Sequence, residues 1–258
     1  MPAHVRRMTV DTLTLMHRNT LRYRRMPELI MVTLIQPLIV LLLFRYVLGG
    51  EIQLEAYIQY LMPGVFGMAV INGSMTIGIA LAGDITSGIV DRMRALPIAR
   101  SSFFVARSLT DIAKNIVIIP LVGVLGVIVG FHLKGTFTHV LIAGALLLAF
   151  GFACAWISMT IALWAGSVEA TQGIIFPVIM VASFASSGFA PIDTMPSWLQ
   201  SVVKANPVTY VDDAVRTLTT TAHGPAVHNI VSSLIWIAAI LVVTVPLVVV
   251  RYTRRTRR

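Results

Sequence analysis

The chain has 258 residues, of which 57% are hydrophobic and 12% are charged, and its mean hydropathy is +0.84. This composition excludes an ordinary water-soluble domain and is typical of a membrane protein. The formal net charge of +9 alone would also fit a nucleic-acid-binding protein, so the positions of the charges must decide between the two classes.

The first 26 residues carry six arginines and no long apolar run. At 100° per residue, one face of a helix would carry Val5, Met8, Leu15, Met16 and Tyr23. Arg7, Arg18 and Arg25 would lie opposite, so segment 1–26 is predicted to be an amphipathic helix on the inner membrane surface. A disordered basic tail is the alternative. No cleavage site follows the first apolar run, and we expect that run to be an uncleaved anchor.

Six apolar runs approach the length of about 20 residues that a membrane-spanning helix needs. They cover residues 29–48, 60–82, 113–132, 140–164, 170–188 and 229–250. The sequence therefore predicts an all-α membrane protein with six transmembrane helices in one domain, residues 1–258. The fifth run is the least regular, because Pro177 interrupts it and it is rich in Ser and Ala.

The basic residues predict the topology. Six of the 20 Lys and Arg residues precede the first span, five lie between Arg92 and Lys114, and five follow the last span. Cytoplasmic loops collect Lys and Arg, so both termini and loop 84–112 are expected in the cytoplasm, and Glu51 and Glu55 outside. The partner of this charge is then the lipid of the cytoplasmic membrane and no nucleic acid is needed.

Motifs of several enzyme classes are missing from the sequence. It has no GxxxxGK[ST], HExxH or GxSxG, and neither its six scattered His residues nor Cys154 indicates a metal, cofactor or catalytic site. Arg45 is the only charge predicted well inside a span. This disfavours an ion-coupled carrier or a membrane-embedded enzyme, which would need buried Asp, Glu or His residues.

Small residues four apart predict close helix packing, in Ser74, Gly78 and Ala82 and again in Gly126 and Gly130. Packing within one subunit is favoured over packing between two. Prolines inside apolar runs indicate kinks or helix ends. They are Pro37, Pro120, Pro177 and Pro246.

The polar segment 84–97 interrupts the apolar runs. Its apolar stripe at helical spacing consists of Ile85, Ile89, Met93 and Leu96. Asp91, Arg92 and Arg94 supply its charges, and Pro97 should end the helix. The pattern predicts a short amphipathic cytoplasmic helix, with a solvated connector as the alternative.

A second unusual segment, 189–225, precedes the last span and is too polar to cross a membrane. Pro191, Pro196 and Pro207 divide it into short pieces. Trp198 and Tyr210 are typical interfacial anchors, and Asp212 or Asp213 can pair with Arg216. We expect a re-entrant outer segment of two short helices, held against the bundle by Trp198 and the Asp/Arg pair; an ordinary outer loop is the alternative.

These features together resemble the ABC-2 type permeases, the membrane subunits of ABC exporters, and especially their daunorubicin-resistance branch, which includes lipid exporters. The resemblance covers essentially the whole chain. It is carried by the basic N-terminal helix, by "GIVDRMRALPIARSSFFVAR" and by "FAPIDTMPSWLQSVVKANPVTYVDDAVR". Residues matching the family pattern in the last stretch are Pro191, Met195, Pro196, Trp198, Leu199, Asn206, Pro207 and Arg216. The family often has Glu-rich sequence where this chain has "GDITSGIVD", which leaves Asp84 and Asp91 as acidic candidates.

The resemblance implies a half-transporter that pairs with a second permease copy or a paralogue and sits on separate ATPase subunits, which bind ATP and Mg²⁺. Segment 84–97 would be the coupling helix that docks into the ATPase. The implied substrates are amphipathic drugs, polyketides or lipids. An exporter of lipid-linked glycans, and less so an ion-coupled carrier, remain as alternatives.

Overall fold

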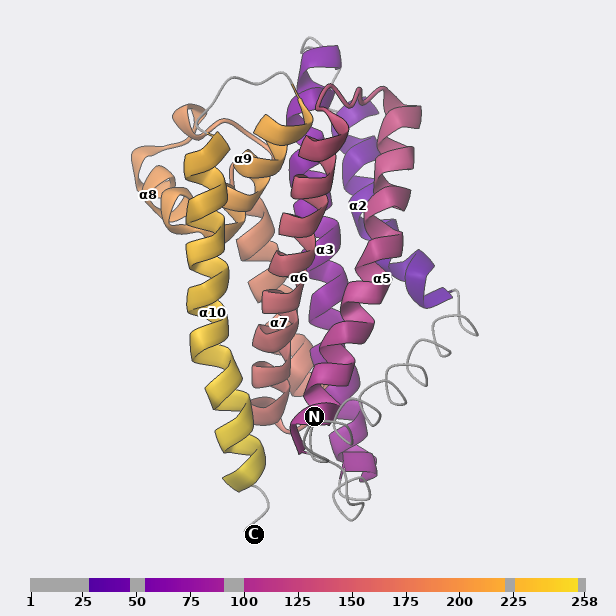
Figure 1. Ribbon diagram of the computed structural model, residues 1–258, viewed down its shortest axis with the longest axis vertical. Coiled ribbons are helices and arrows are strands. Elements are labelled where there is room, and N and C mark those ends of the chain that lie inside the picture. Colours follow the sequence, from indigo (N-terminus) through magenta and orange to yellow (C-terminus); the bar gives the residue numbers. More distant parts are fainter. Residues whose placement is uncertain (1–27, 47–53, 91–99, 221–225, 255–258) are drawn as a thin grey trace.

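A computed structural model describes residues 28–46, 54–90, 100–220 and 226–254, and all regular structure in them is helical (Figure 1). The long helices are α2 (Glu28–Tyr46), α3 (Leu54–Thr86), α5 (Arg100–Val129), α6 (Phe137–Ala165), α7 (Val168–Phe184) and α10 (Ala226–Arg254). Three short helices lie between α7 and α10. They are η1 (Ile192–Thr194), α8 (Ser197–Ala205) and α9 (Pro207–Thr219).

Each of the six predicted apolar runs contains a helix, which confirms the all-α fold. Among the described residues, four helices, α3, α5, α6 and α10, are long and apolar enough to cross a membrane, whereas α2 and α7 are shorter apolar helices. The count of six spans therefore stays a prediction. The four prolines lie inside continuous helices and end none of them. The predicted helix 1–26 lies outside the described residues.

Helix α3 is the central element of the bundle. It carries no charged residue from Ala56 to Gly83. In its most apolar stretch of 18 residues, 83% of the residues are buried within the protein. Helices α2, α5, α6, α7 and α9 pack against it, and α10 packs on α6 and α9. A membrane helix gains little from burying apolar surface, since lipid tails are equally apolar, so close packing stabilises this arrangement.

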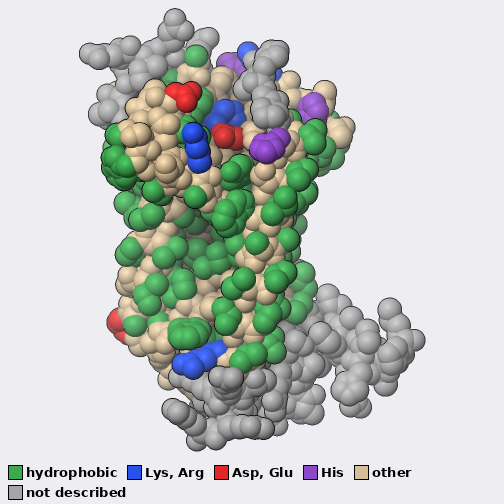
Figure 2. Space-filling model, turned by 90° about the vertical axis from the view of Figure 1, so that its left-hand side faces the viewer, with side chains coloured by type: hydrophobic (Ala, Val, Ile, Leu, Met, Phe, Trp, Pro, Cys, Tyr) green, Lys and Arg blue, Asp and Glu red, His purple; other side chains and the backbone are tan. Residues whose placement is uncertain are grey.

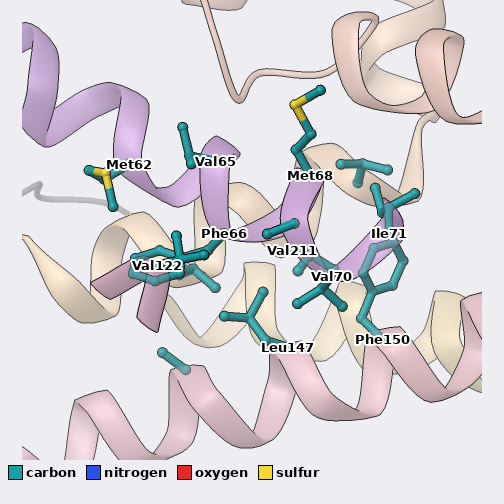
Figure 3. Close-up of a cluster of buried hydrophobic side chains, with 14 of the residues drawn as sticks. Met62, Val65, Phe66, Met68, Val70, Ile71, Val122, Leu147, Phe150 and Val211 are labelled. Atoms are coloured by element: carbon teal, nitrogen blue, oxygen red, sulfur yellow. The ribbon is translucent and has the colours of Figure 1, made fainter. Parts of the chain in front are cut away.

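Helix α3 contributes many of the side chains of the main buried hydrophobic cluster (Figure 3). Met62, Phe66 and Ile71 of α3 are buried in this cluster, together with Leu147 and Phe150 of α6. Helix α5 adds Val122 and α9 adds Val211, so the short segment before α10 belongs to the same core as the long helices.

The bundle has two polar ends. Figure 2 shows hydrophobic side chains over the middle of the visible face, with charged side chains near its top and bottom. We call the end with η1, α8 and α9 the cap end, and the opposite end, where α3 stops at Thr86 and α10 stops at Arg254, the loop end (Figure 1). At the loop end Gly88 has φ +71°, a left-handed conformation in which glycine ends the helix.

Gly78 allows α3 and α6 to approach each other closely. A Cβ atom at Gly78 would lie 2.3 Å from the carbonyl oxygen of Ser158 on α6. Ser74 and Ala82, on the same stripe, are fully buried. The stripe therefore packs inside one chain, which confirms the favoured interpretation of these small residues.

We predict that Gly78→Ala lowers the stability of the purified protein by about 1–3 kcal/mol, because the added methyl group meets backbone that cannot rotate away. Gly144→Ala on α6 is the matched control, since a Cβ there meets no atom within 4 Å. Thermal unfolding in detergent measures both variants. Equal melting temperatures would contradict the close approach of α3 and α6.

Candidate functional site

The segment predicted as a coupling helix begins inside α3. Helix α3 continues through Thr86, so Ile85 lies in its last turn, half-buried against an apolar cluster at the loop end. The chain turns at Ser87 and Gly88, and Ile89 is helical again. The other predicted coupling residues lie outside the described residues, and their role stays a prediction. They are Asp91, Arg92, Met93, Arg94, Leu96 and Pro97.

An ion pair connects the two helices on either side of this loop. The Arg107 guanidinium of α5 donates a hydrogen bond to the Asp84 carboxylate of α3, and also to the carbonyl oxygen of Ile77 at 3.4 Å. Arg107 is buried, so little water competes for its hydrogen bonds. The ends of α3 and α5 are therefore held together where the polar loop leaves the bundle and returns to it.

A second, deeper set of polar contacts connects the same helices. Lys114 Nζ of α5 lies 2.6 Å from Asp111 Oδ1 and donates to the carbonyl oxygen of Gly73 on α3. The Ser74 hydroxyl of α3 donates to Asp111 Oδ2 at 2.6 Å. Asp111 and Lys114 are both buried, at 1% and 5% exposure. The pair is therefore far from water and depends on its own partners.

Neighbouring residues extend this set to a third helix. Asn115 Nδ2 donates to Asp111 Oδ2 at 3.1 Å and to the Ser74 hydroxyl at 3.2 Å. Ser158 Oγ on α6 donates to the carbonyl oxygen of Ser74 at 3.3 Å. A Cβ atom at Gly151 of α6 would lie 2.9 Å from Asn115 Nδ2, so glycine leaves the room that the amide occupies.

The expectation that Arg45 is the only charge well inside a span is wrong. Helix α5 begins at Arg100 and not near residue 113, which places Asp111 and Lys114 about 16–21 Å along it at 1.5 Å per residue. Hydropathy averaged over a window missed the pair. The three-residue spacing of Asp111 and Lys114, which puts opposite charges on one helix face, was the signal available in the sequence.

At the cap end, Arg216 of α9 connects three parts of the chain. Its guanidinium pairs with Asp213 and donates to the carbonyl oxygens of Ser187 at 2.8 Å and Tyr60 at 3.3 Å. It also lies 3.9 Å from the centre of the Tyr60 ring, in a cation–π contact. The sequence offered Asp212 and Asp213 as acidic partners of Arg216, and in the structure Asp213 forms the ion pair. Arg216 thus holds α9 against α3 and against the turn that follows α7.

Asp212 points the other way, into the protein. It is 1% exposed; its Oδ2 accepts from the Ser186 hydroxyl at 3.1 Å, and its Oδ1 has no hydrogen-bond partner among the described residues. A Cβ atom at Gly67 or Gly188 would lie within 2.3 or 2.6 Å of its carboxylate oxygens. Burial raises the pKa of Asp212 to about 8, although Arg216 acts in the opposite direction. Asp212 is therefore mostly protonated at neutral pH.

Trp198 does not hold α8 against the bundle, contrary to expectation. Its side chain is 70% exposed, and Val203 is the α8 residue that is fully buried. The sequence pattern identified an amphipathic ring but not what the ring contacts, because a tryptophan at a membrane interface and one in a core look alike in sequence. Pro191 and Pro196 precede η1 and α8 as their N-cap residues.

Asn206 joins α7 to α9. Its side-chain oxygen accepts from the Val208 amide at 3.0 Å, which caps α9, and its amide group donates to the carbonyl oxygens of Ala182 at 2.8 Å and Ala185 at 2.7 Å. Pro207 occupies the first turn of α9, where its missing amide costs nothing. Tyr210 donates to the carbonyl oxygen of Lys204 at 2.9 Å.

We predict that Lys114→Met lowers stability by about 3–5 kcal/mol, because it leaves the buried Asp111 carboxylate without its cation. Adding Asp111→Asn should restore most of the loss, since the amide keeps hydrogen bonds to Ser74 and Asn115 and carries no charge. Thermal unfolding of both variants measures the effect. A double variant no more stable than Lys114→Met alone would contradict the importance of this pairing.

We predict that Asp212→Asn reduces the pH dependence of stability. The folded-state pKa of about 8 lies above the ordinary 3.8, so the folded protein binds the extra proton and stability falls as pH rises through that window. The amide is neutral throughout and removes this fall. Melting temperatures between about pH 5 and about pH 9 provide the test, and parallel curves for variant and wild type would exclude a protonated Asp212.

Comparison with known proteins agrees with this architecture. The model of the family described as ABC-2 type transporter matches residues 10–219. A daunorubicin resistance ABC transporter permease protein of Streptomyces coeruleorubidus is 33% identical over 83% of this chain and 76% of its own length. A "Probable doxorubicin resistance ABC transporter permease protein" of Mycobacterium tuberculosis is 27% identical over 84% of this chain and 81% of its own length. The chain belongs to the ABC-2 type transporter family.

Proposed function

We propose that this chain is the transport subunit of an ATP-driven exporter that moves amphipathic molecules, such as drugs, polyketides or lipids, out across the cytoplasmic membrane. A separate ABC ATPase subunit would bind ATP and Mg²⁺. Family membership and the names of the two drug-resistance relatives support this role. In this proposal six helices span the membrane, with both termini and the loop end in the cytoplasm and the cap end outside.

The observation that carries the proposal is the double connection between α3 and α5. The Asp84/Arg107 pair joins them beside loop 87–99, and the contacts of Asp111 and Lys114 with α3 join them again deeper in the bundle. A force on that loop would therefore move α3 and α5 together and would not spread them apart. Since most other helices pack on α3, such a displacement can reorient the bundle as a rigid-body transition.

The part of segment 84–97 available for docking on the ATPase is then 89–97, with Ile85 fixing its start in α3. Ile89 and Met93 would fill an apolar groove of the ATPase. The charges of Asp91, Arg92 and Arg94 would select and orient the partner, because complementary charges govern specificity at interfaces.

At the outer side, segment 189–225 would cap the exit from the bundle. Arg216 and Asn206 fix α9 to α3 and α7, while the exposed Trp198 on α8 would lie in the lipid headgroup region. A second permease copy or a paralogue would complete the pathway. Thr76 supports this, because it is an exposed polar residue that lies between buried residues in the middle of α3.

We predict that Asp91→Lys reduces ATPase co-purification at least tenfold without changing the amount of permease in the membrane. A like charge placed at a partner's basic residue costs affinity, and coupling of close charge pairs is about 1.5–7 kcal/mol. Combining Ile89→Ser with Met93→Ser should have a similar effect through lost apolar contact. The measurement is the ratio of ATPase to permease after affinity purification from membranes, together with export.

Lys204→Glu is the matched control, because it reverses an exposed charge on α8 at the opposite end of the bundle. It should leave the ratio of ATPase to permease unchanged. Full co-purification and full export with both loop variants would return segment 84–97 to the role of a solvated connector.

A further inference from the structure

A groove of about 760 Å³ lies between the cap-end halves of α5 and α6, which run side by side in Figure 1. Phe66 of α3 and Val215 of α9 contribute to its lining. Ile116, Val124 and Leu141 also line it and are exposed, so the groove opens sideways from the bundle toward the surrounding membrane.

The lining is apolar throughout except for Thr219, whose hydroxyl already donates to the carbonyl oxygen of Val215 at 2.7 Å. The backbone oxygen of Thr219 accepts from the Lys134 amide at 3.0 Å. A polar drug would leave its own hydroxyl or amino groups without partners in such a groove, which is unfavourable. A methylene chain has no such groups and suits this lining.

Small residues create the hollow. Gly123 and Gly144 face it from α5 and α6, and a Cβ atom at Gly144 would meet no atom within 4 Å. The volume falls within the range of about 300–1,000 Å³ that is typical of ligand sites. Gly144 is therefore a position where a larger side chain would occupy the groove without displacing protein atoms.

A basic residue follows the lining at the cap end of the groove. Leu133 lines the groove, and the next residue, Lys134, is exposed; its backbone amide donates to the carbonyl oxygen of Thr219, another lining residue. His139, also exposed, follows shortly in the chain. The sequence contains no acidic residue between Asp111 and Glu169, so neither α6 nor the α5–α6 connection supplies a negative charge to neutralise Lys134.

We propose that this groove binds one acyl chain of an anionic phospholipid from the outer leaflet, with its headgroup at Lys134. The apolar lining takes the chain and the exposed ammonium group takes the phosphate. The lipid would be a resident component of the membrane and not the exported molecule, so the inference goes beyond the export function and needs no ATPase.

The test uses native mass spectrometry of the full, delipidated chain titrated with phosphatidylglycerol or with phosphatidylcholine of the same acyl chains. Gly144→Leu should weaken phosphatidylglycerol binding about tenfold, the effect of displacing roughly two methylene groups. Lys134→Gln should weaken it about fivefold and remove the preference over phosphatidylcholine. Gly144→Ala, which leaves the groove open, and Ala239→Leu on the exposed face of α10 should both bind as wild type does.

A second measurement does not depend on any variant. Phosphatidylglycerol with a photoreactive acyl chain should label residues 116–128 and 140–148 of the wild-type protein in vesicles. Labelling spread evenly over the exposed faces of the helices, or unchanged binding by Gly144→Leu, would overturn the proposal. A change in the ratio of monomer to dimer on Gly144→Leu, without a change in lipid binding, would assign the groove to a contact between two copies instead.

Discussion

The pairing of Asp111 with Lys114 is the interaction on which the bundle most depends. Both side chains extend from α5 and are buried in the bundle, where an unpaired charge would be very unfavourable, so each requires the other and the polar groups of α3. That requirement fixes the register of α5 against Gly73 and Ser74, and through Ser158 the position of α6.

Polar contacts at both ends of the bundle converge on the same helix. Asp84 connects the loop end of α3 to α5, and Tyr60 connects its cap end to α9 through Arg216. Between them, Gly78 lets α6 approach α3 closely. In the proposed mechanism, a displacement that begins at loop 87–99 would therefore reach the cap through one continuous helix.

Apolar periodicity predicted where the helices lie, because run length and residue type determine that property locally. It could not predict which side chains contact each other across the bundle. The choice of Asp213 over Asp212 depends on how α9 is rotated against Tyr60 and Ser187, which are distant in sequence. Likewise, the sequence places Asp111 and Lys114 among the loop charges because it sets the start of α5 too late. It identifies Trp198 as an interfacial anchor but not what its ring contacts, because tertiary packing sets those contacts. For the loop residues from Asp91 to Pro97, which lie outside the described residues, the prediction of a coupling helix rests on the sequence pattern.

Charge neutrality inside the bundle has an electrical consequence. Three ion pairs, at the loop end, in the middle and at the cap end, each join one acidic and one basic side chain and are therefore neutral as pairs. Moving one elementary charge across 100 mV costs about 2.3 kcal/mol, so a bundle with unpaired charges would work with or against the membrane potential at every cycle. If α3 shifted with these pairs intact, the pairs would carry no net charge across the field. In the proposed cycle they would therefore add no coupling between the switching of the bundle and the membrane potential.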